Sequence, residues 1–344
     1  MSAPCRILHD ASLRERNTFR IQAHAKRLIE VADAAALPEA LAGESARPMV
    51  LGGGSNLLFA GDPDGALVAL TGVRSKIVSD DGDAVVVRSD AGLEWHALVM
   101  SMLARGLNGL ENLALIPGTV GAAPIQNIGA YGVEVRDRIH AVEAFEPATG
   151  RSLRFAPAEC EFAYRDSLFK REPDRFVVTA VEFALSRDPA VQVEYAGIRD
   201  ELAAMGVDGT PTPAQVADAV IRLRRRKLPD PAVIGNAGSF FKNPIVPSDQ
   251  AAALQDENAA LPIFRGDAET TRKLSAAWLI DACGWKGHRD GDAGVSEKHA
   301  LVLVNHGAAT GMQLLDLARR IADSVRKKFG VDLEPEPRIV GAKW

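Results

Sequence analysis

One serine of this chain lies in a segment suited to chemistry. Ser239 follows Gly238 and precedes two phenylalanines, and Lys242 lies slightly further on. Glycine lets a backbone approach a ligand closely and adjacent phenylalanines are usually buried, so the segment predicts a dry, shaped pocket. A buried turn is the alternative interpretation. No histidine adjoins Ser239 and no Gly-x-Ser-x-Gly motif contains it, which disfavours a hydrolase triad.

A glycine-rich turn at residues 52–56 is a second candidate site. It reads Gly-Gly-Gly-Ser-Asn and follows a predicted buried strand at residues 48–51. Backbone N–H groups in such a turn can converge on an anion, and Ser55 and Asn56 can add hydrogen bonds. The turn has neither the lysine of a P-loop nor Gly-x-Gly-x-x-Gly spacing. The pattern therefore predicts a phosphate cradle of neither of these classes.

A second glycine-rich segment covers residues 116–132. Small residues dominate it, and it shows neither helical nor strand periodicity. Such a backbone can approach a large, flat ligand closely, and Gln126 and Asn127 would add polar contacts. The alternative is a loop whose glycines are purely structural.

Periodic segments around these loops predict the elements that position them. The expected strands cover residues 48–51, 84–88 and 175–181, and the expected helices cover residues 94–105, 212–227 and 312–329. The helix at residues 212–227 begins with a Thr-Pro-x-Gln cap. It ends in a basic run at residues 222–227, whose arginines are expected to project mostly away from its apolar face.

Composition indicates a globular protein of a reducing compartment. The 344 residues, 47% of them hydrophobic, are enough for two or three domains. The three cysteines form no Cys-x-x-Cys pair and no apolar run approaches about 18 residues, so we expect no disulfide framework, no metal site, no membrane span and a cytoplasmic location. A net charge of −5 disfavours nucleic-acid binding. Without a predicted coiled coil, a monomer is expected.

Two further motifs are Tyr164-Arg165-Asp166-Ser167 and Leu333-Glu334-Pro335-Glu336. With the glycine-rich segments and the Ser239 segment, they resemble the UDP-N-acetylenolpyruvoylglucosamine reductase family, in the family's order over nearly the whole chain. The resemblance implies an α+β protein with an FAD-binding fold of the vanillyl-alcohol-oxidase type. It places two FAD subdomains at residues 1–70 and 71–206, a C-terminal α+β substrate-binding domain at 207–330, and a strand returning to the active site at 331–344.

The resemblance also implies a reaction. The family uses NADPH and FAD to reduce UDP-N-acetylglucosamine enolpyruvate to UDP-N-acetylmuramate in peptidoglycan synthesis. A hydride passes from flavin N5 to the vinyl carbon, and the resulting enolate-like charge needs stabilisation and then a proton. By motif position, Ser239 is the proton donor, and Arg165 and Glu336 stabilise the enol.

The binding residues that the resemblance implies lie in the same segments. Non-covalently bound FAD is expected to contact Gly52, Gly53, Gly54, Ser55, Asn56, Ile116, Gly118, Thr119, Gly121, Gln126, Asn127, Gly129 and Ala130. The substrate is expected to contact Tyr195, Lys227, Asn243 and Lys286. The tyrosine at 195 also suggests the form of the family with an extra tyrosine loop. Phe264 stands where the family's substrate loop places a tyrosine against the diphosphate, and it cannot donate a hydrogen bond.

Two other functions remain open at this stage. One is another flavin oxidoreductase of the same fold that acts on a hydroxy acid or sugar, and the other is a non-catalytic flavin or nucleotide-sugar binding protein. The joint presence of Ser239, Arg165 and Glu336 favours the reductase. Alcohol oxidation has no evident use for this set, and a binding protein would not need it.

Overall fold

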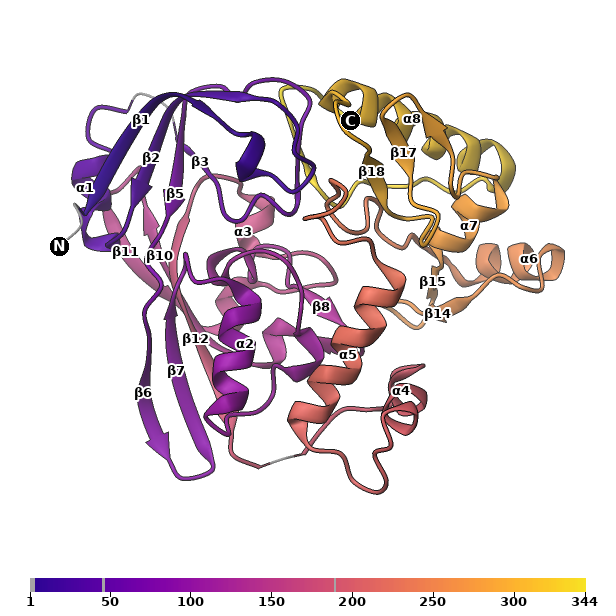
Figure 1. Ribbon diagram of the computed structural model, residues 1–344, viewed down its shortest axis with the longest axis horizontal. Coiled ribbons are helices and arrows are strands. Elements are labelled where there is room, and N and C mark those ends of the chain that lie inside the picture. The colour runs from indigo at the N-terminus through magenta and orange to yellow at the C-terminus, as the bar shows by residue number, and fades with distance from the viewer. Residues whose placement is uncertain (1–3, 45–46, 189) are drawn as a thin grey trace. The chain divides into compact units, whose positions relative to one another are not determined.

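The computed structural model describes residues 4–44, 47–188 and 190–344, and Figure 1 shows the course of the chain. The chain forms two compact units, each assembled from separated segments. Unit 1 comprises residues 1–11, 25–53 and 64–225, and unit 2 comprises residues 12–24, 54–63 and 226–344. The four domains expected from the sequence, with boundaries at residues 70, 206 and 330, are each continuous in the chain. This four-part organisation stays a prediction about functional domains.

Unit 1 contains two main sheets. The first has the order β1-β2-β5-β3, in which β5 runs parallel to β2 and β3. Its strands are β1 (Cys5–Ser12), β2 (His24–Val31), β3 (Met49–Val50) and β5 (Ala66–Leu70). The second is antiparallel, in the order β11-β10-β12-β7-β6. Its strands are β6 (Ser75–Asp81), β7 (Ala84–Asp90), β10 (Ile139–Glu146), β11 (Arg151–Phe155) and β12 (Val177–Ser186), and a separate hairpin joins β8 (Gly129–Ala130) to β9 (Val133–Glu134). The three expected strands are confirmed as β3, β7 and β12.

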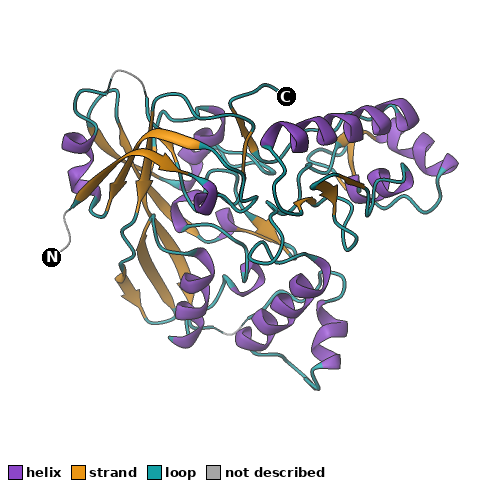
Figure 2. Ribbon diagram, turned by 45° about the horizontal axis from the view of Figure 1, so that its top comes forward, coloured by secondary structure: helices purple, strands orange, loops and turns teal. Residues whose placement is uncertain are grey.

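Helices contribute to the core of unit 1, and Figure 2 distinguishes helices from strands by colour. They are α1 (Leu37–Ala40), α2 (Trp95–Ala104), α3 (Leu168–Arg171), α4 (Ile198–Ala204) and α5 (Pro213–Lys227). The apolar faces of α2 and α5 share one hydrophobic core with β7, β10 and β12. The predicted cap of α5 is present, because Thr212 N donates to Gln215 Oε1 at 2.8 Å and Gln215 N donates to Thr212 Oγ1 at 3.3 Å. Both expected helices of this unit are confirmed.

An ion pair of the antiparallel sheet makes the stability of unit 1 depend on pH. Arg154 on β11 donates two hydrogen bonds to Glu182 on β12, at 3.1 Å to Oε1 and 2.5 Å to Oε2. The hydrogen bond from Arg154 lowers the pKa of Glu182, although burial opposes this shift. Since the folded-state pKa lies below the unfolded-state pKa, the pair stabilises the fold above about pH 4.3. That contribution is lost as the pH falls through the folded-state pKa.

We therefore expect Glu182→Gln to lower the free energy of unfolding by about 1 kcal/mol at pH 7 and by less under acidic conditions. Urea unfolding of both proteins at about pH 7 and about pH 3.5 measures the difference. An equal loss at both pH values would mean that the two oxygen acceptors of Glu182 for Arg154, not its charge, are what the fold uses.

Unit 2 contains three small sheets and three α-helices. The sheets have the orders β13-β15-β14, β16-β17-β18 and β19-β4. The strands are β4 (Leu57–Phe59), β13 (Ile245–Pro247), β14 (Ile263–Arg265), β15 (Thr271–Leu274), β16 (Arg289–Asp290), β17 (Ala293–Val295), β18 (Leu303–Asn305) and β19 (Arg338–Val340), and the helices are α6 (Ser248–Glu257), α7 (Ala276–Ala282) and α8 (Gly311–Phe329). The parallel pair β4–β19 joins the second and last segments of this unit.

The last predicted helix is confirmed as α8. A capping box between Thr310 and Gln313 begins it, and Gly330 ends it with φ +64°. Its apolar stripe is buried in the core, including Leu314 and Ile321. No helix in the described ranges is both long and apolar enough to span a bilayer.

Candidate active site

The two glycine-rich segments contact each other within unit 1. A Cβ atom added to Gly53 would lie 3.0 Å from Gly118 Cα, and one added to Gly52 would lie 3.0 Å from Thr119 Oγ1. Gly52 and Gly53 are exposed, and in the described ranges their N–H groups donate no hydrogen bond to protein atoms. Exposed N–H groups on adjacent glycines suit a bound diphosphate. These residues therefore fit the diphosphate of FAD.

The remaining part of the turn belongs to unit 2. Gly54 has φ +62°, and a Cβ atom there would lie 2.0 Å from the Arg16 carbonyl oxygen. Only glycine fits this position. Asn56 Nδ2 donates to Glu336 O at 3.3 Å, and Asn56 O accepts a hydrogen bond from Arg338 N at 3.0 Å. The turn is thus bonded to the segment that carries Glu336.

The segment at residues 116–132 folds as a series of tight turns. Gly118 has φ +123°, a 3-10 helix covers Val120–Ala122, and the segment ends in the β8–β9 hairpin. A Cβ atom on Gly121 would lie 2.6 Å from Ala91 Cβ, so the segment lies closely against the residue that follows β7. Most of the expected FAD contacts here are half-buried, namely Ile116, Gly118, Thr119, Gly121, Gln126, Gly129 and Ala130, whereas Asn127 is fully buried. Small residues at accessible positions fit a flat ring system.

Arg165 lies in a tight turn beside this segment. Ala163 and Asp166 exchange two backbone hydrogen bonds, at 3.0 and 3.2 Å, and Arg165 has φ +55°. This conformation costs a non-glycine residue about 1 kcal/mol or more, so other contacts must hold the turn. Arg165 Nη2 donates to Gly129 O at 2.8 Å, and Lys170 Nζ donates to Arg165 O at 2.9 Å. The turn thereby fixes a half-buried guanidinium, a group that stays charged and can bind a carboxylate.

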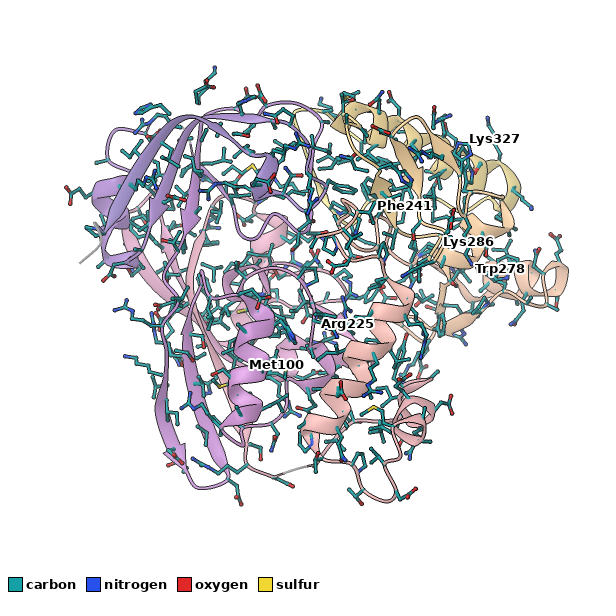
Figure 3. The ribbon with its side chains drawn as sticks, viewed as in Figure 1. Met100, Arg225, Phe241, Trp278, Lys286 and Lys327 are labelled. Atoms are coloured by element: carbon teal, nitrogen blue, oxygen red, sulfur yellow. The ribbon has the colours of Figure 1, made fainter. Side chains whose placement is uncertain are left out.

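Ser239 lies in a segment of unit 2 that is fixed on both sides. The buried Asn236 donates to two backbone carbonyl groups, and its Oδ1 accepts a hydrogen bond from Gly238 N at 3.0 Å. After the serine, Phe240 and Phe241 are fully buried, whereas Ser239 is half-buried. Figure 3 labels Phe241 within this unit. The aromatic anchors are as expected, and they leave part of the serine accessible.

The backbone pairs Glu336 with the Ser239 segment. Glu336 N donates to Phe240 O at 2.8 Å, and Lys242 N donates to Glu334 O at 3.0 Å. An ion pair of 2.9 Å between Lys242 Nζ and Glu334 Oε2 supports the same pairing. The two antiparallel segments therefore bring Ser239 and Glu336 to neighbouring positions of unit 2.

Two of the expected substrate contacts already have protein partners. Tyr195 of unit 1 is 49% exposed, and its ring packs edge-on against Tyr131 with 5.3 Å between the centroids. Asn243 of unit 2 accepts a hydrogen bond at Oδ1 from Ala276 N, at 3.0 Å, where α7 begins. The amide nitrogen of Asn243 is then the group oriented for a ligand.

The other two, Lys227 and Lys286, are exposed lysines whose charges act on His299. Burial lowers the pKa of His299, and the two lysines lower it further. Leu301 N donates to His299 Nδ1 at 3.3 Å, which assigns the proton of the neutral ring to Nε2. Two cations and a neutral donor suit an anionic ligand. No local pattern in the sequence distinguishes His299. Figure 3 labels Lys286.

Arg224 is a second residue that the sequence analysis missed. It is half-buried in unit 1, and its Nε donates to Leu115 O at 3.2 Å. Burial lowers the pKa of Arg224. The charge on Arg165 lowers this pKa further, and Tyr131 raises it. The expected outward projection holds for Arg225, which is exposed and labelled in Figure 3. Helical spacing could have identified Arg224, which follows the buried Val220 by one turn.

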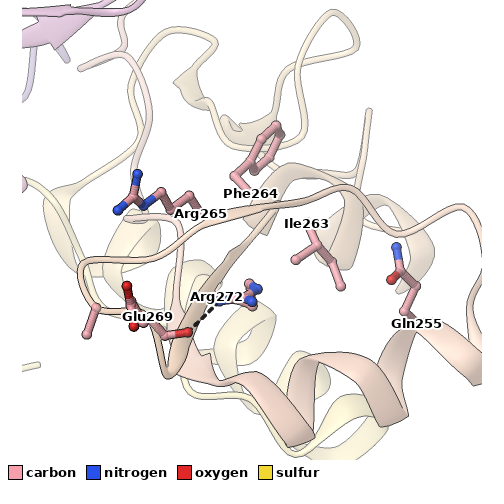
Figure 4. A pocket seen from close by; sticks show the side chains of 7 residues that line it. Gln255, Ile263, Phe264, Arg265, Glu269 and Arg272 are labelled. Carbon is pink, nitrogen blue, oxygen red and sulfur yellow. Dashed lines mark hydrogen bonds between the residues drawn. The ribbon is translucent and has the colours of Figure 1, made fainter.

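A pocket of about 590 Å³ lies in unit 2 between α6 and the hairpin of β14 and β15, as Figure 4 shows. Its lining residues are Gln255, Ile263, Phe264, Arg265, Ala268, Glu269 and Arg272. Phe264 is half-exposed there, and Arg272 Nη1 donates to Glu269 O at 2.9 Å. Among residues 4–44, 47–188 and 190–344, no three His, Cys, Asp and Glu side chains are grouped to hold a metal ion.

Comparisons with known proteins identify the family of this chain. Residues 26–156 match the FAD binding domain family. Together with the glycine-rich segments, this match defines the chain as an FAD-binding oxidoreductase. Residues 230–340 match the C-terminal domain of UDP-N-acetylenolpyruvoylglucosamine reductase.

Full-length relatives make the assignment specific. The chain is 56% identical over 341 residues to the UDP-N-acetylenolpyruvoylglucosamine reductase of Xanthomonas euvesicatoria pv. vesicatoria, covering 98% of this chain and 97% of that one. It is 55% identical over 337 residues to that of Xanthomonas oryzae pv. oryzae, covering 97% and 96%. The crystal structure of the reductase from Thermus caldophilus superposes with a TM-score of 0.68 at 26% identity, covering 98% of both chains.

The chain therefore belongs to the UDP-N-acetylenolpyruvoylglucosamine reductase family. It is a UDP-N-acetylmuramate dehydrogenase of peptidoglycan precursor synthesis that uses FAD and NADPH. The expected fold, enzyme class and cofactors are confirmed. The two alternative functions raised by the sequence are set aside.

Proposed function

We propose that Ser239, Arg165 and Glu336 carry out the reduction of UDP-N-acetylglucosamine enolpyruvate to UDP-N-acetylmuramate. When bound, FAD supplies a hydride from N5 to the terminal vinyl carbon, after its own reduction by NADPH. The substrate then bears an enolate-like charge beside its carboxylate. Arg165 and Glu336 stabilise that charge, and the Ser239 hydroxyl donates a proton to the adjacent carbon. Solvent returns the proton to Ser239.

The pairing of the Ser239 and Glu336 segments carries this proposal. The hydrogen bond of 2.8 Å from Glu336 N to Phe240 O brings the backbone of Glu336 beside the segment that carries Ser239, from a distant part of the sequence. The buried phenylalanines hold the backbone on which the serine lies. A proton donor must be held this firmly, because a misplacement of about 1 Å can cost on the order of 100-fold in rate.

The binding residues are proposed from their contacts and their accessibility. We assign FAD binding to the turn at residues 52–56 and to the expected residues of 116–130, apart from the side chain of Asn127, which protein atoms engage. Tyr195, Lys227, Asn243 and Lys286 are assigned to the substrate. The exposed Tyr195, packed on Tyr131, supports the form of the family with an extra tyrosine loop. A cytoplasmic monomer completes the proposal.

Anaerobic half-reactions test the reaction. NADPH should bleach the flavin absorption of the purified protein, and UDP-N-acetylglucosamine enolpyruvate should then restore it with formation of UDP-N-acetylmuramate. Bleaching without restoration would contradict the proposed substrate. A protein purified without flavin and unable to bind FAD would contradict the cofactor assignment.

Arg165→Lys should separate these half-reactions. Lysine keeps the positive charge but loses the two parallel hydrogen bonds that a guanidinium makes to a carboxylate. We expect the substrate-dependent reoxidation of flavin to slow by about 30-fold, whereas flavin reduction by NADPH stays within about twofold. Stopped-flow absorbance of each half-reaction measures both. Unchanged reoxidation would remove Arg165 from the proposed mechanism.

A further inference from the structure

The side chain of Asn127 joins the second glycine-rich segment to the turn that carries Arg165. Asn127 is fully buried. Its Nδ2 donates to Ala163 O at 3.0 Å and to Glu134 Oε2 at 2.9 Å. Its Oδ1 accepts a hydrogen bond from Arg136 N at 3.1 Å. Both amide hydrogens and the amide oxygen are therefore engaged by protein atoms of the same unit.

This geometry gives the side chain of Asn127 a task other than contact with FAD. Its two donated bonds lead away from the segment at residues 116–130, one to the first residue of the Arg165 turn and one to a carboxylate on β9. Glu134 also forms an ion pair of 2.8 Å with Arg136 Nε. Because Glu134 and the backbone of Arg136 bind opposite ends of the amide, they fix which end faces Ala163.

The turn needs such support. The left-handed backbone of Arg165 is sparsely populated for a residue with a Cβ atom and persists where surrounding contacts determine it. Asn127 holds the carbonyl of Ala163, two residues before Arg165, and the guanidinium donates to Gly129 O, two residues after Asn127. The same short segment, residues 127–129, thus holds both the backbone and the side chain of the Arg165 turn.

We infer that Asn127 is a positioning residue for Arg165 and acts on the reaction only through that guanidinium. The inference rests on the proposed role of Arg165. A guanidinium that binds a carboxylate in two places must be held to within about 0.5 Å and about 10–20°. Without the hydrogen bond from Asn127 to Ala163 O, the turn can move, and the Arg165 guanidinium then binds the substrate carboxylate less well.

A double-mutant cycle tests this inference on the FAD-loaded enzyme. N127A alone should slow substrate-dependent reoxidation of flavin by about 10-fold and raise the KM for the enolpyruvate substrate. It should leave flavin reduction by NADPH within about twofold. In an R165K background, N127A should slow substrate-dependent reoxidation by less than a further factor of about two, because the two-point binding of the carboxylate that Asn127 supports is already lost. Asn108→Ala is the control, since it removes a buried amide of unit 1 that donates to Asp188 O.

The outcomes are distinguishable. If N127A slows reoxidation equally in both backgrounds, its effect does not pass through Arg165 and the inference is wrong, while the proposed function stands. If R165K itself has no effect, the proposed role of Arg165 fails. If N127A does not fold, N127D replaces it, because the isosteric side chain keeps an acceptor for Arg136 N and loses the donor to Ala163 O. N127D with unaltered reoxidation would also overturn the inference.

Discussion

Ser239→Ala should abolish turnover almost completely while flavin reduction by NADPH survives. The substitution removes one oxygen atom from a half-buried position, and the buried phenylalanines that follow still anchor the segment. Proton donation by a positioned side chain contributes up to about 10⁴-fold, so we expect substrate-dependent reoxidation of flavin to slow by about 10³-fold or more. Stopped-flow absorbance measures each half-reaction, and thermal unfolding should show nearly unchanged stability.

Ser248→Ala is the matched control for that substitution. Its hydroxyl, also in unit 2, makes no hydrogen bond in the described part of the chain. The control should therefore retain both half-reactions. If Ser239→Ala slows both half-reactions equally, Ser239 supports cofactor or structure and is not the proton donor. If neither half-reaction slows, another group protonates the substrate.

Gly54→Ala should cost both stability and bound FAD. An added Cβ atom would lie 2.0 Å from the Arg16 carbonyl oxygen, a backbone atom, and φ of +62° disfavours any side chain. The backbone must move, and the combined strain should lower the free energy of unfolding by about 3 kcal/mol. Since Gly54 lies inside the glycine-rich turn, this movement displaces the N–H groups beside it. The flavin-to-protein ratio after gel filtration and the melting temperature report the two effects.

Gly65→Ala separates the two causes. Gly65 has a similar φ of +76°, but a Cβ atom there has no neighbour within 4 Å. This control should lose about 1 kcal/mol and keep its FAD. Equal flavin loss in both variants would mean that backbone strain alone, without the clash at Arg16, disturbs the cofactor.

Local signals explain which elements the sequence could predict. The helix at residues 312–329 has its own capping box, apolar stripe and terminal glycine, so nothing distant is needed to recognise it. β4 and β19 are three residues each and exist because they pair with each other. No local pattern distinguishes strands this short. The division into two units is equally non-local, since residues 12–24 join a unit built mainly from residues 226–344.

The candidate site could likewise be predicted only in part. Glycine content and aromatic neighbours indicated the two glycine-rich segments and Ser239, and the resemblance supplied their roles. The sequence could not predict which of their atoms form hydrogen bonds within the protein. The amide of Asn127 is indistinguishable in sequence from that of Gln126, yet it is fully used by Ala163, Glu134 and Arg136. The charges of Lys227 and Lys286, which lie elsewhere in the sequence, likewise lower the pKa of His299, and no local pattern predicts this effect.

The parallel pairing of β4 with β19 sets the order in which this protein can be completed during translation. Leu57–Phe59 leave the ribosome early, whereas Arg338–Val340 follow nearly all of the described chain. Contacts between such distant segments form late, because a long loop must close first. A nascent chain therefore carries its first glycine-rich turn before the strand that borders it has been made. Glu336 lies in the same late segment, so its backbone hydrogen bond to Phe240 O also waits for this part of the chain.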